Sequence, residues 1–216
     1  MVVVFDVLRA TSTQAAILSL SGNRVLPCRS MDEARAWKAE HPEWVLAGER
    51  DGVPPEGFDR GNSPLEWADG RQGVTVIHTT TNGTRAMKAG EGMGAAGVLA
   101  AGLVNARAVA SYLARDFAAG GGGRPLILIL AGTGDDFALE DAVGAARVLE
   151  LLDADHPWRA LAPRDPDHAL HLLRQSRNGR RLQSLGLDAD VAWCARMDTV
   201  SVVPVLKDGM LVPLAG

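Results

Sequence analysis

The chain has 216 residues, of which 47% are hydrophobic and 22% charged, and its formal net charge at pH 7 is −4. This composition predicts a globular protein, because disordered chains are less hydrophobic and carry more net charge. The acidic balance argues against nucleic acid as an electrostatic partner. No apolar run approaches the roughly 20 residues of a membrane-spanning helix, and no secretory leader precedes the first strand. We therefore expect a cytoplasmic protein with no membrane partner.

Strands and helices alternate along the sequence, which predicts an α/β fold. Short β-branched runs indicate strands, and the pairs Ser30/Glu33 and Ser63/Glu66 form capping boxes that open helices. In chain order, the predicted strands cover 2–5, 24–28, 45–47, 74–77, 97–101, 126–130, 200–206 and 210–213; the predicted helices end at Gly22, carry Trp37, follow Ser63, and cover 85–90, 106–119, 137–152, 166–176 and 179–185.

The first unit is an apolar strand, a polar loop and a helix. Residues 2–5 predict a buried strand, and the carboxylate of Asp6 and the guanidinium of Arg9 follow directly. The next helix begins with hydroxyl side chains, including Thr11 and Ser12. Ligands of parallel α/β sheets gather at such carboxyl ends of strands, so these four residues are candidates for a binding site.

A second unit places the sequence HTTTNGTRA directly after the apolar run 74–77. Asn82-Gly83 predicts a tight turn with positive φ, and Thr84 predicts the N-cap of the following helix. Free amides at this turn would bind an anion, and Arg85 would add a cation. The predicted phosphate-binding residues of the turn are Thr81, Asn82, Gly83 and Thr84. An ordinary capped turn is the alternative interpretation.

A third unit follows the strand 126–130, where Gly132 and Gly134 open a turn and Glu140 and Asp141 begin a helix. Magnesium prefers oxygen ligands and commonly uses one or two carboxylates plus substrate phosphate. The candidate ligands are Asp6, Glu49, Glu140 and Asp141; stabilisation of a helix dipole is the alternative role for the last two. We expect Asp135 and Asp136 to be solvated turn residues, and leave Asp59 open between turn former and ligand.

The two cysteines, Cys28 and Cys194, are too few for a disulfide scaffold or a cysteine zinc site, so we expect both to be buried and reduced. Four of the five histidines lie in polar or proline-flanked segments and are expected at the surface. His78 instead ends an apolar strand. Two roles stay open for it: proton donor to a leaving alkoxide, or a packed strand-end residue.

Several of these motifs together resemble the 2-phosphosulfolactate phosphatase family. They are FDVLRATST, LAGERDG, GFDRGNSP, HTTTNGTRA, the segment 131–141 and VAWCARMDTVSVVP, and they run in family order over nearly the whole chain. The resemblance implies an α/β fold and a magnesium-dependent phosphatase, best known for a step towards coenzyme M. Because family members also occur where that pathway is not expected, the reaction class carries over more securely than the substrate.

Two features depart from the family pattern. Family chains usually extend further upstream of the first strand, which here begins at Met1. We therefore expect either a missing N-terminal strand or a start placed too far downstream, with an unpaired sheet edge next to Asp6. Arg60 stands where the family usually has an apolar residue, and adds a cation near the loop or on the surface.

For the whole chain we predict a three-layer α/β/α fold with a mixed, mostly parallel sheet. Residues 1–216 form a single phosphatase-like domain, and two similar halves, 1–120 and 124–216, are the alternative. The boundary between such halves would be the glycine tract 120–123, which is the chain's only low-complexity segment.

We predict a Mg²⁺-dependent phosphatase of a small acidic phosphate ester, with Asp6, Arg9 and Arg85 as catalytic residues. Thr11 and Ser12 join the turn in binding phosphate, while water and Asp6 both stay open as the nucleophile. Candidate substrate-binding residues are Arg50, Asn62, Ser63 and Asn105, with Arg107 as a further cation. A non-catalytic anion sensor or oligomer component is the main alternative, and a non-hydrolytic enzyme such as an isomerase is another. A homo-oligomer is compatible with each.

Overall fold

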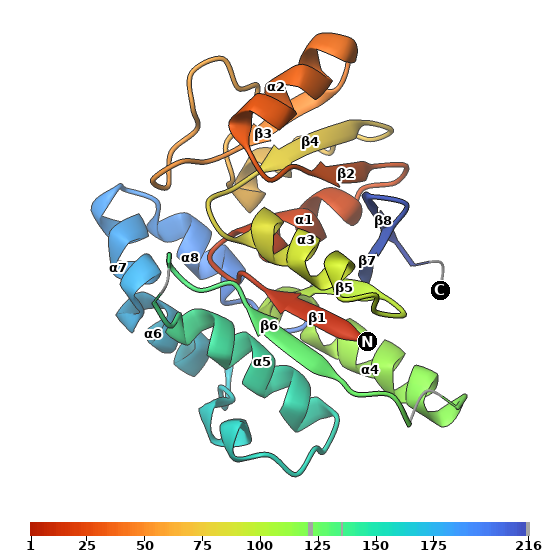
Figure 1. The fold of residues 1–216 in the computed structure, drawn as a ribbon. Coiled ribbons are helices and arrows are strands. Elements are labelled where there is room, and N and C mark those ends of the chain that lie inside the picture. Colours follow the sequence, from red (N-terminus) through yellow and green to blue (C-terminus); the bar gives the residue numbers. More distant parts are fainter. Residues whose placement is uncertain (121–122, 135, 215–216) are drawn as a thin grey trace.

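We describe a computed structural model that covers residues 1–120, 123–134 and 136–214 (Figure 1). Its strands form one mixed sheet in the order β3-β4-β2-β8-β7-β5-β1-β6. The strands are β1 (Val2–Phe5), β2 (Arg24–Pro27), β3 (Val45–Gly48), β4 (Thr75–Thr79), β5 (Val98–Ala101), β6 (Ile127–Leu130), β7 (Pro204–Lys207) and β8 (Met210–Pro213).

Helices cover both faces of this sheet, so the predicted three-layer α/β/α fold is confirmed. The α-helices are α1 (Ala10–Leu18), α2 (Met31–Glu40), α3 (Gly83–Gly92), α4 (Ala106–Ala118), α5 (Leu139–Leu151), α6 (Pro166–Gln175), α7 (Arg177–Ser184) and α8 (Asp188–Cys194). Among these described helices, none combines the length and apolarity needed to cross a membrane.

The sheet consists of two parallel groups joined by an antiparallel hairpin. β1 pairs in parallel with β5 and β6, and β4 pairs in parallel with β2 and β3. The β7–β8 hairpin connects the groups by pairing antiparallel with β5 on one side and β2 on the other. Its turn, Asp208-Gly209, has positive φ at both residues (50° and 78°), as tight hairpins require.

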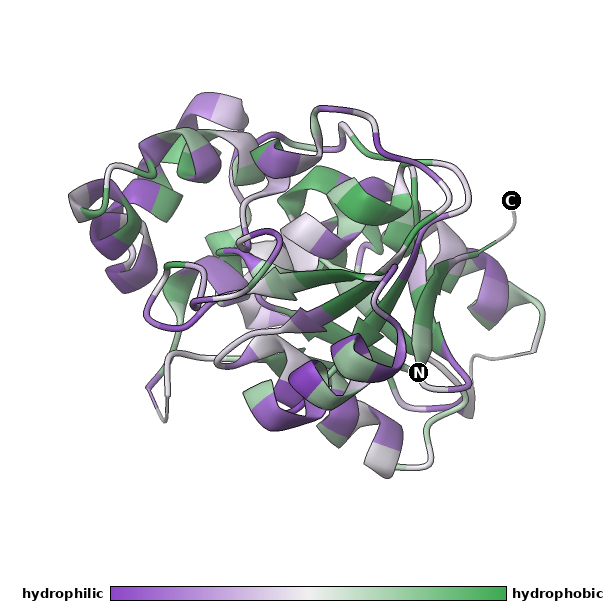
Figure 2. Ribbon diagram, turned by 90° about the horizontal axis from the view of Figure 1, so that it is seen from above, coloured by the Kyte–Doolittle hydropathy of each residue, from purple (hydrophilic) through white to green (hydrophobic). Residues whose placement is uncertain are grey.

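Alternation along β1 shows why its residues are apolar on both faces. Val2 and Val4 face the cluster that contains α1 and α3, while Val3 and Phe5 face the cluster that contains α4 and α5. All four side chains are fully buried. A strand covered on both faces is expected to be apolar throughout, and Figure 2 shows this continuous apolar character along the central strands.

A separate cluster of helices, α6 to α8, lies at the carboxyl end of β1. Leu173 of α6, Leu182 of α7 and Val191 of α8 pack with Val7 and Leu8, which directly follow β1. The helices α6 to α8 therefore cover the loop that carries Asp6, and α7 forms one wall of the site described below. The helices α6 and α7 match predicted helices, whereas no helix was predicted at 188–194.

Several local expectations need correction. The strand β1 lies between β5 and β6, so the sheet edges are β3 and β6 and no unpaired edge adjoins Asp6. The helix predicted at 85–90 begins at Gly83, and the residues after Ser63 form a short 3-10 helix, Pro64–Trp67. The residues 121–122 of the glycine tract and Asp135 lie outside the described residues.

Candidate active site

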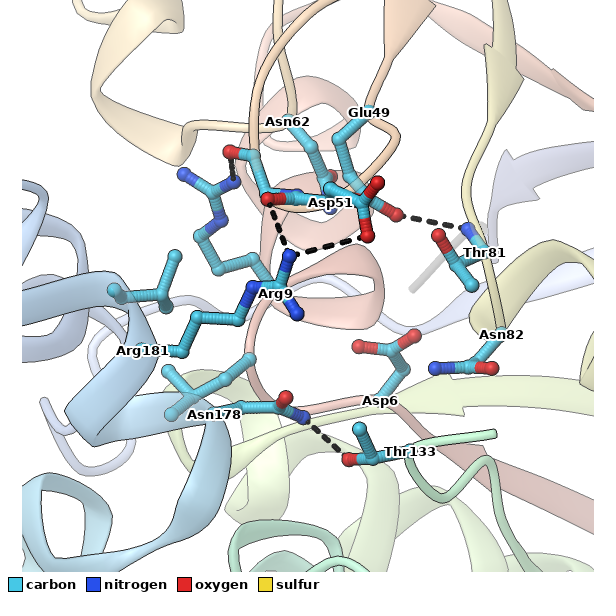
Figure 3. Close-up of a pocket in the computed structure, with 13 residues that line it drawn as sticks. Asp6, Arg9, Glu49, Asp51, Asn62, Thr81, Asn82, Thr133, Asn178 and Arg181 are labelled. Carbon is cyan, nitrogen blue, oxygen red and sulfur yellow. Dashed lines mark hydrogen bonds and ion pairs between the residues drawn. The ribbon is translucent and has the colours of Figure 1, made fainter. Parts of the chain in front are cut away.

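A cavity lies where the carboxyl ends of β1, β3 and β4 meet the helix α7 (Figure 3). Asp6 directly follows β1, Glu49 directly follows β3, and Thr81 lies two residues after the end of β4. The predicted site residues that line the cavity are Asp6, Arg9, Glu49, Asn62, Thr81 and Asn82. The fold therefore brings these six predicted residues together at one cavity.

Asp6 lies at the centre of the cavity wall. Its Oδ1 accepts a hydrogen bond of 3.1 Å from the amide of Ala10, and the amide of Gly83 donates to the same carboxylate. Burial first, and then the charges of Glu49 and Glu140, raise the pKa of Asp6 to about 7 against these hydrogen bonds. A carboxylate held this way favours a compensating cation.

Glu49 follows β3 and connects two loops. Its Oε1 accepts from the amide of Thr81 at 2.8 Å, and its Oε2 accepts from the amide of Gly52 at 2.9 Å. The Thr81 amide, which was predicted to bind phosphate, is thus already occupied by a carboxylate in this structure.

Glu140 and Asp141 begin α5 and are both almost fully buried. Asp141 accepts from the amides of Val7 (2.9 Å) and Gly132 (3.0 Å), so it fixes the loops after β1 and β6. Burial and the nearby charges of Asp6 and Glu140 raise its pKa well above the ordinary value. Glu140 accepts from Asn178 at 2.6 Å through Oε1, and its buried Oε2 has no partner among the described residues.

The turn after β4 lies where the sequence predicted it, but its backbone conformation and hydrogen bonds differ from those predicted. Gly83 has no positive φ; instead, a Cβ at this position would lie 2.6 Å from Asp6 Oδ2 and 2.6 Å from the Ala10 Cβ. Thr84 does not cap α3, because its hydroxyl and amide bond to Thr80. Glycine is therefore required at position 83 by close approach rather than by backbone conformation.

Arg9 enters the cavity wall as a buried, paired cation. It forms an ion pair with Asp190 of α8 and donates to the Gly52 carbonyl at 2.7 Å. Ser63 donates to the other oxygen of Asp190 at 2.6 Å. In this structure the predicted residues Arg9 and Ser63 thus join α8 to the loops, and Asp190 neutralises the guanidinium.

The other predicted cations lie outside this cavity. Arg50 and Arg85 line a neighbouring depression instead, and Arg107 pairs with Asp198 at the start of α4. Asp59 accepts from the Leu46 amide and from Lys38, which makes it a turn former. Arg60 pairs with Asp69 at the surface.

Three predicted polar residues are fully buried and bonded within the fold. Thr11 donates to the Ala101 carbonyl at 2.7 Å, Ser12 donates to the Val7 carbonyl at 2.8 Å, and Asn105 bonds the Gly102 amide at 2.9 Å. They connect the first loop, α1 and β5, and none of them lines the cavity. Asn105 occupies the N-cap position of α4 without a capping side-chain bond.

The buried imidazole of His78 lies between the side-chain amides of Gln14 and Asn62. Gln14 Nε2 lies 3.3 Å from its Nδ1, and Asn62 Oδ1 lies 3.1 Å from its Nε2. A neutral imidazole protonated at Nε2 satisfies both contacts, with the tautomer assigned from the partners. Burial first, and then Arg50, lower the pKa of His78 to about 4, so this packed histidine stays neutral.

The residues that α7 and its neighbours contribute were not predicted from the sequence. Asn178 and Arg181 line the cavity from α7, opposite Asp6, and Thr133 and Asp51 complete the rim. Arg181 pairs with Asp51 at 3.1 Å, and Asn178 donates to Thr133 at 2.8 Å. Their only sequence signal was a polar face on a short helix, which is typical of any exposed helix.

Both cysteines match their predicted role. Cys28 and Cys194 are buried and free, and burial raises the pKa of each thiol to about 12. Among the described residues, no group of three or more histidine, cysteine, aspartate or glutamate side chains is arranged to hold a metal ion. The charges of Asp6, Glu49, Glu140 and Asp141 influence one another, but among the described residues these carboxylates do not form a preformed metal site.

Comparisons with known proteins agree on one family. A family model described as 2-phosphosulpholactate phosphatase matches residues 1–209. A protein of Carboxydothermus hydrogenoformans is 37% identical over 98% of this chain and 89% of its own length. A relative from Deinococcus radiodurans is 37% identical over 97% of this chain and 89% of its own length. A relative from Synechococcus sp. strain JA-3-3Ab is 38% identical over 99% of this chain and 91% of its own length. Each of the three is named a probable 2-phosphosulfolactate phosphatase.

Proposed function

The chain belongs to the 2-phosphosulpholactate phosphatase family, and on this premise we propose that it hydrolyses 2-phosphosulfolactate to sulfolactate and phosphate. The observation that carries the proposal is the site itself: Asp6 and Glu49 line one cavity beside the start of α3, where Glu49 accepts from the Thr81 amide and Gly83 lies against Asp6. The comparisons give no support to a non-catalytic sensor, since the relatives named above are all described as phosphatases.

We further propose that Mg²⁺ binds to Asp6 together with Glu49 and Glu140. These residues fit such an ion because Asp6 has a raised pKa next to like charges and Glu140 has a buried oxygen without a partner among the described residues. Mg²⁺ commonly takes one or two carboxylates and completes its shell with water and phosphate, so a preformed cage is not required. When bound, it would supply positive charge to the phosphoryl oxygens.

The protein's own groups are suited to positioning a phosphoryl group. The transition state of phosphoryl transfer spreads negative charge over oxygens, and fixed donors stabilise that charge. The Gln14–His78–Asn62 chain occupies the Oδ1 of Asn62, which leaves its NH₂ group as a donor at the cavity. Arg181 and the ion-paired Arg9 add further donors at the cavity, while Thr133 and Glu140 accept from the amide group of Asn178. The predicted cytoplasmic location and homo-oligomer remain predictions.

The test is phosphate release from 2-phosphosulfolactate, measured with Mg²⁺ and with excess chelator. We expect Mg²⁺-dependent release, and we expect Asp6→Asn to lower kcat/KM by about 100-fold or more because it removes the central charge. Asn can still accept the Ala10 amide, so the far-ultraviolet circular dichroism spectrum should not change. Full activity in chelator would exclude the metal, and no release from the ester under any condition would exclude the proposed reaction.

A further inference from the structure

A second depression, of about 400 Å³, adjoins the candidate active site. We call it the arginine pocket; its charged lining residues are Arg29, Asp32, Arg50 and Arg85, and its hydroxyl residues are Ser30, Thr80 and Thr81. Thr81 also lines the active-site cavity, and Arg50 directly follows Glu49 of that cavity. The active-site cavity and the arginine pocket are thus neighbours that share Thr81.

The arginine pocket has a positive balance of charge. Three guanidinium groups face one carboxylate, that of Asp32, and none of the three forms an ion pair among the described residues. Arg50 is held only by neutral oxygens: the Thr79 hydroxyl at 2.9 Å, the Thr79 carbonyl at 3.2 Å and the Glu49 carbonyl at 2.5 Å. Its position is therefore fixed while its charge is left without a counterion.

The active-site cavity shows the opposite arrangement. Both of its arginines are neutralised, Arg9 by Asp190 and Arg181 by Asp51, and its wall carries the further carboxylates Asp6 and Glu49. A substrate with a second anionic group would find no unpaired cation for it there. The neighbouring arginine pocket, which shares Thr81 with the cavity, does hold unpaired cations among the described residues.

We propose that the arginine pocket is a second anion subsite, which binds the sulfonate or carboxylate of an ester whose phosphoryl group lies in the active-site cavity. The proposal rests on the proposed phosphatase function and assigns residues to the second anionic group of its substrate. Good substrates carry at least one anionic group besides the phosphate, because an Arg50–anion or Arg85–anion hydrogen bond is charge-assisted. Esters of neutral alcohols lack this contact.

The kinetic test compares three esters: 2-phosphosulfolactate, phospholactate without the sulfonate, and an aryl phosphate with neither group. For Arg50→Gln and Arg85→Gln, we expect kcat/KM on 2-phosphosulfolactate to fall by about tenfold more than on the aryl phosphate. Loss on phospholactate as well assigns the carboxylate to the pocket, and loss confined to 2-phosphosulfolactate assigns the sulfonate. Arg24→Gln, an exposed arginine at the opposite end of β2 from Arg29, is the control and should change neither ratio.

A binding test separates this inference from the proposed reaction. Sulfolactate lacks the phosphoryl group, so its affinity, measured by calorimetric titration, does not depend on hydrolysis. We expect Arg50→Gln/Arg85→Gln to weaken sulfolactate binding by about tenfold or more relative to Arg24→Gln. Binding that depends on these arginines in a protein that releases no phosphate would refute the reaction but support the subsite. Equal losses on all three esters, or an unchanged sulfolactate affinity, would overturn the subsite.

Discussion

At the scale of single residues, the site depends on close approach between Asp6 and Gly83. A side chain at position 83 would meet both the Asp6 carboxylate and Ala10 at 2.6 Å, so Asp6 must move if Gly83 is replaced. The sequence placed Gly83 in the site, but for a reason of backbone conformation that the structure contradicts. No local pattern could reveal the contact, because Asp6 follows β1 and Gly83 begins α3, far apart in the sequence.

We therefore predict that Gly83→Ala lowers kcat/KM by at least about tenfold and destabilises the fold by about 1–3 kcal/mol through overpacking. The matched control is Gly92→Ala on the same helix, where a Cβ meets no atom within 4 Å. This control should keep wild-type turnover. Steady-state kinetics and urea unfolding measure both effects, and equal turnover in the two variants would show that close approach at position 83 is unimportant.

His78 gives a pH-dependent contribution to stability whose sign follows from its burial. Its pKa is about 4 in the folded chain and about 6.5 when exposed, so the unfolded state binds more protons between these values. This contribution is complete above pH 6.5 and is lost as the pH falls, with a slope of at most about 1.4 kcal/mol per pH unit.

We predict that His78→Gln, which keeps a donor for Asn62 but does not titrate, removes this slope. The measurement is the free energy of unfolding in urea at several pH values between 4.5 and 7, a window chosen from the two pKa values. The buried carboxylates Asp6 and Asp141 are the same in both proteins, so the difference isolates His78. His171→Gln, at an exposed histidine, should retain the wild-type slope; a similar slope for His78→Gln would contradict the buried neutral state.

At the scale of elements, α8 is attached to the site by Asp190. This carboxylate is 2% exposed and accepts from both Arg9 and Ser63, which lie in two distant loops. The helix α8 was not predicted from the sequence, because its seven residues, Asp188–Cys194, give too short a window for a helical period. The strand-loop-helix units were predictable, since apolar runs and turn residues are local signals. The helices α6 and α7 were predicted too, but their contacts with the site were not, since those contacts are long-range.

Two aspartates on α8 allow a matched prediction. Asp190→Ala leaves a buried guanidinium without a partner and should cost about 3–5 kcal/mol. Asp188→Ala removes a half-exposed pair with Arg174, in which both side chains are over 40% exposed, and should cost about 0–1 kcal/mol. Unfolding free energies in urea test the difference. If the two variants were equally stable, the Arg9–Asp190 pair would not anchor α8.

At the scale of the whole molecule, strands from the segment before residue 120 and strands from the segment after residue 124 lie side by side in one sheet. The β7–β8 hairpin, from the segment after residue 124, lies between β2 and β5 of the segment before residue 120. β6, also from the later segment, lies beside β1. Neither segment can therefore complete its own sheet, and the glycine tract joins parts that interleave in space (Figure 1).

We predict from this interleaving that the chain unfolds in a single cooperative transition. Trp67 reports on the earlier segment and Trp193 on the later one, so variants that retain one of these tryptophans give a separate fluorescence probe for each part. Both probes and the circular dichroism signal should give the same urea midpoint, because losing the hairpin exposes β2 and β5 together. The fragment 1–120, which lacks the strands between β2 and β5, should not fold alone. Two separated midpoints, or a folded fragment, would mean that the segments are independent units despite their shared sheet.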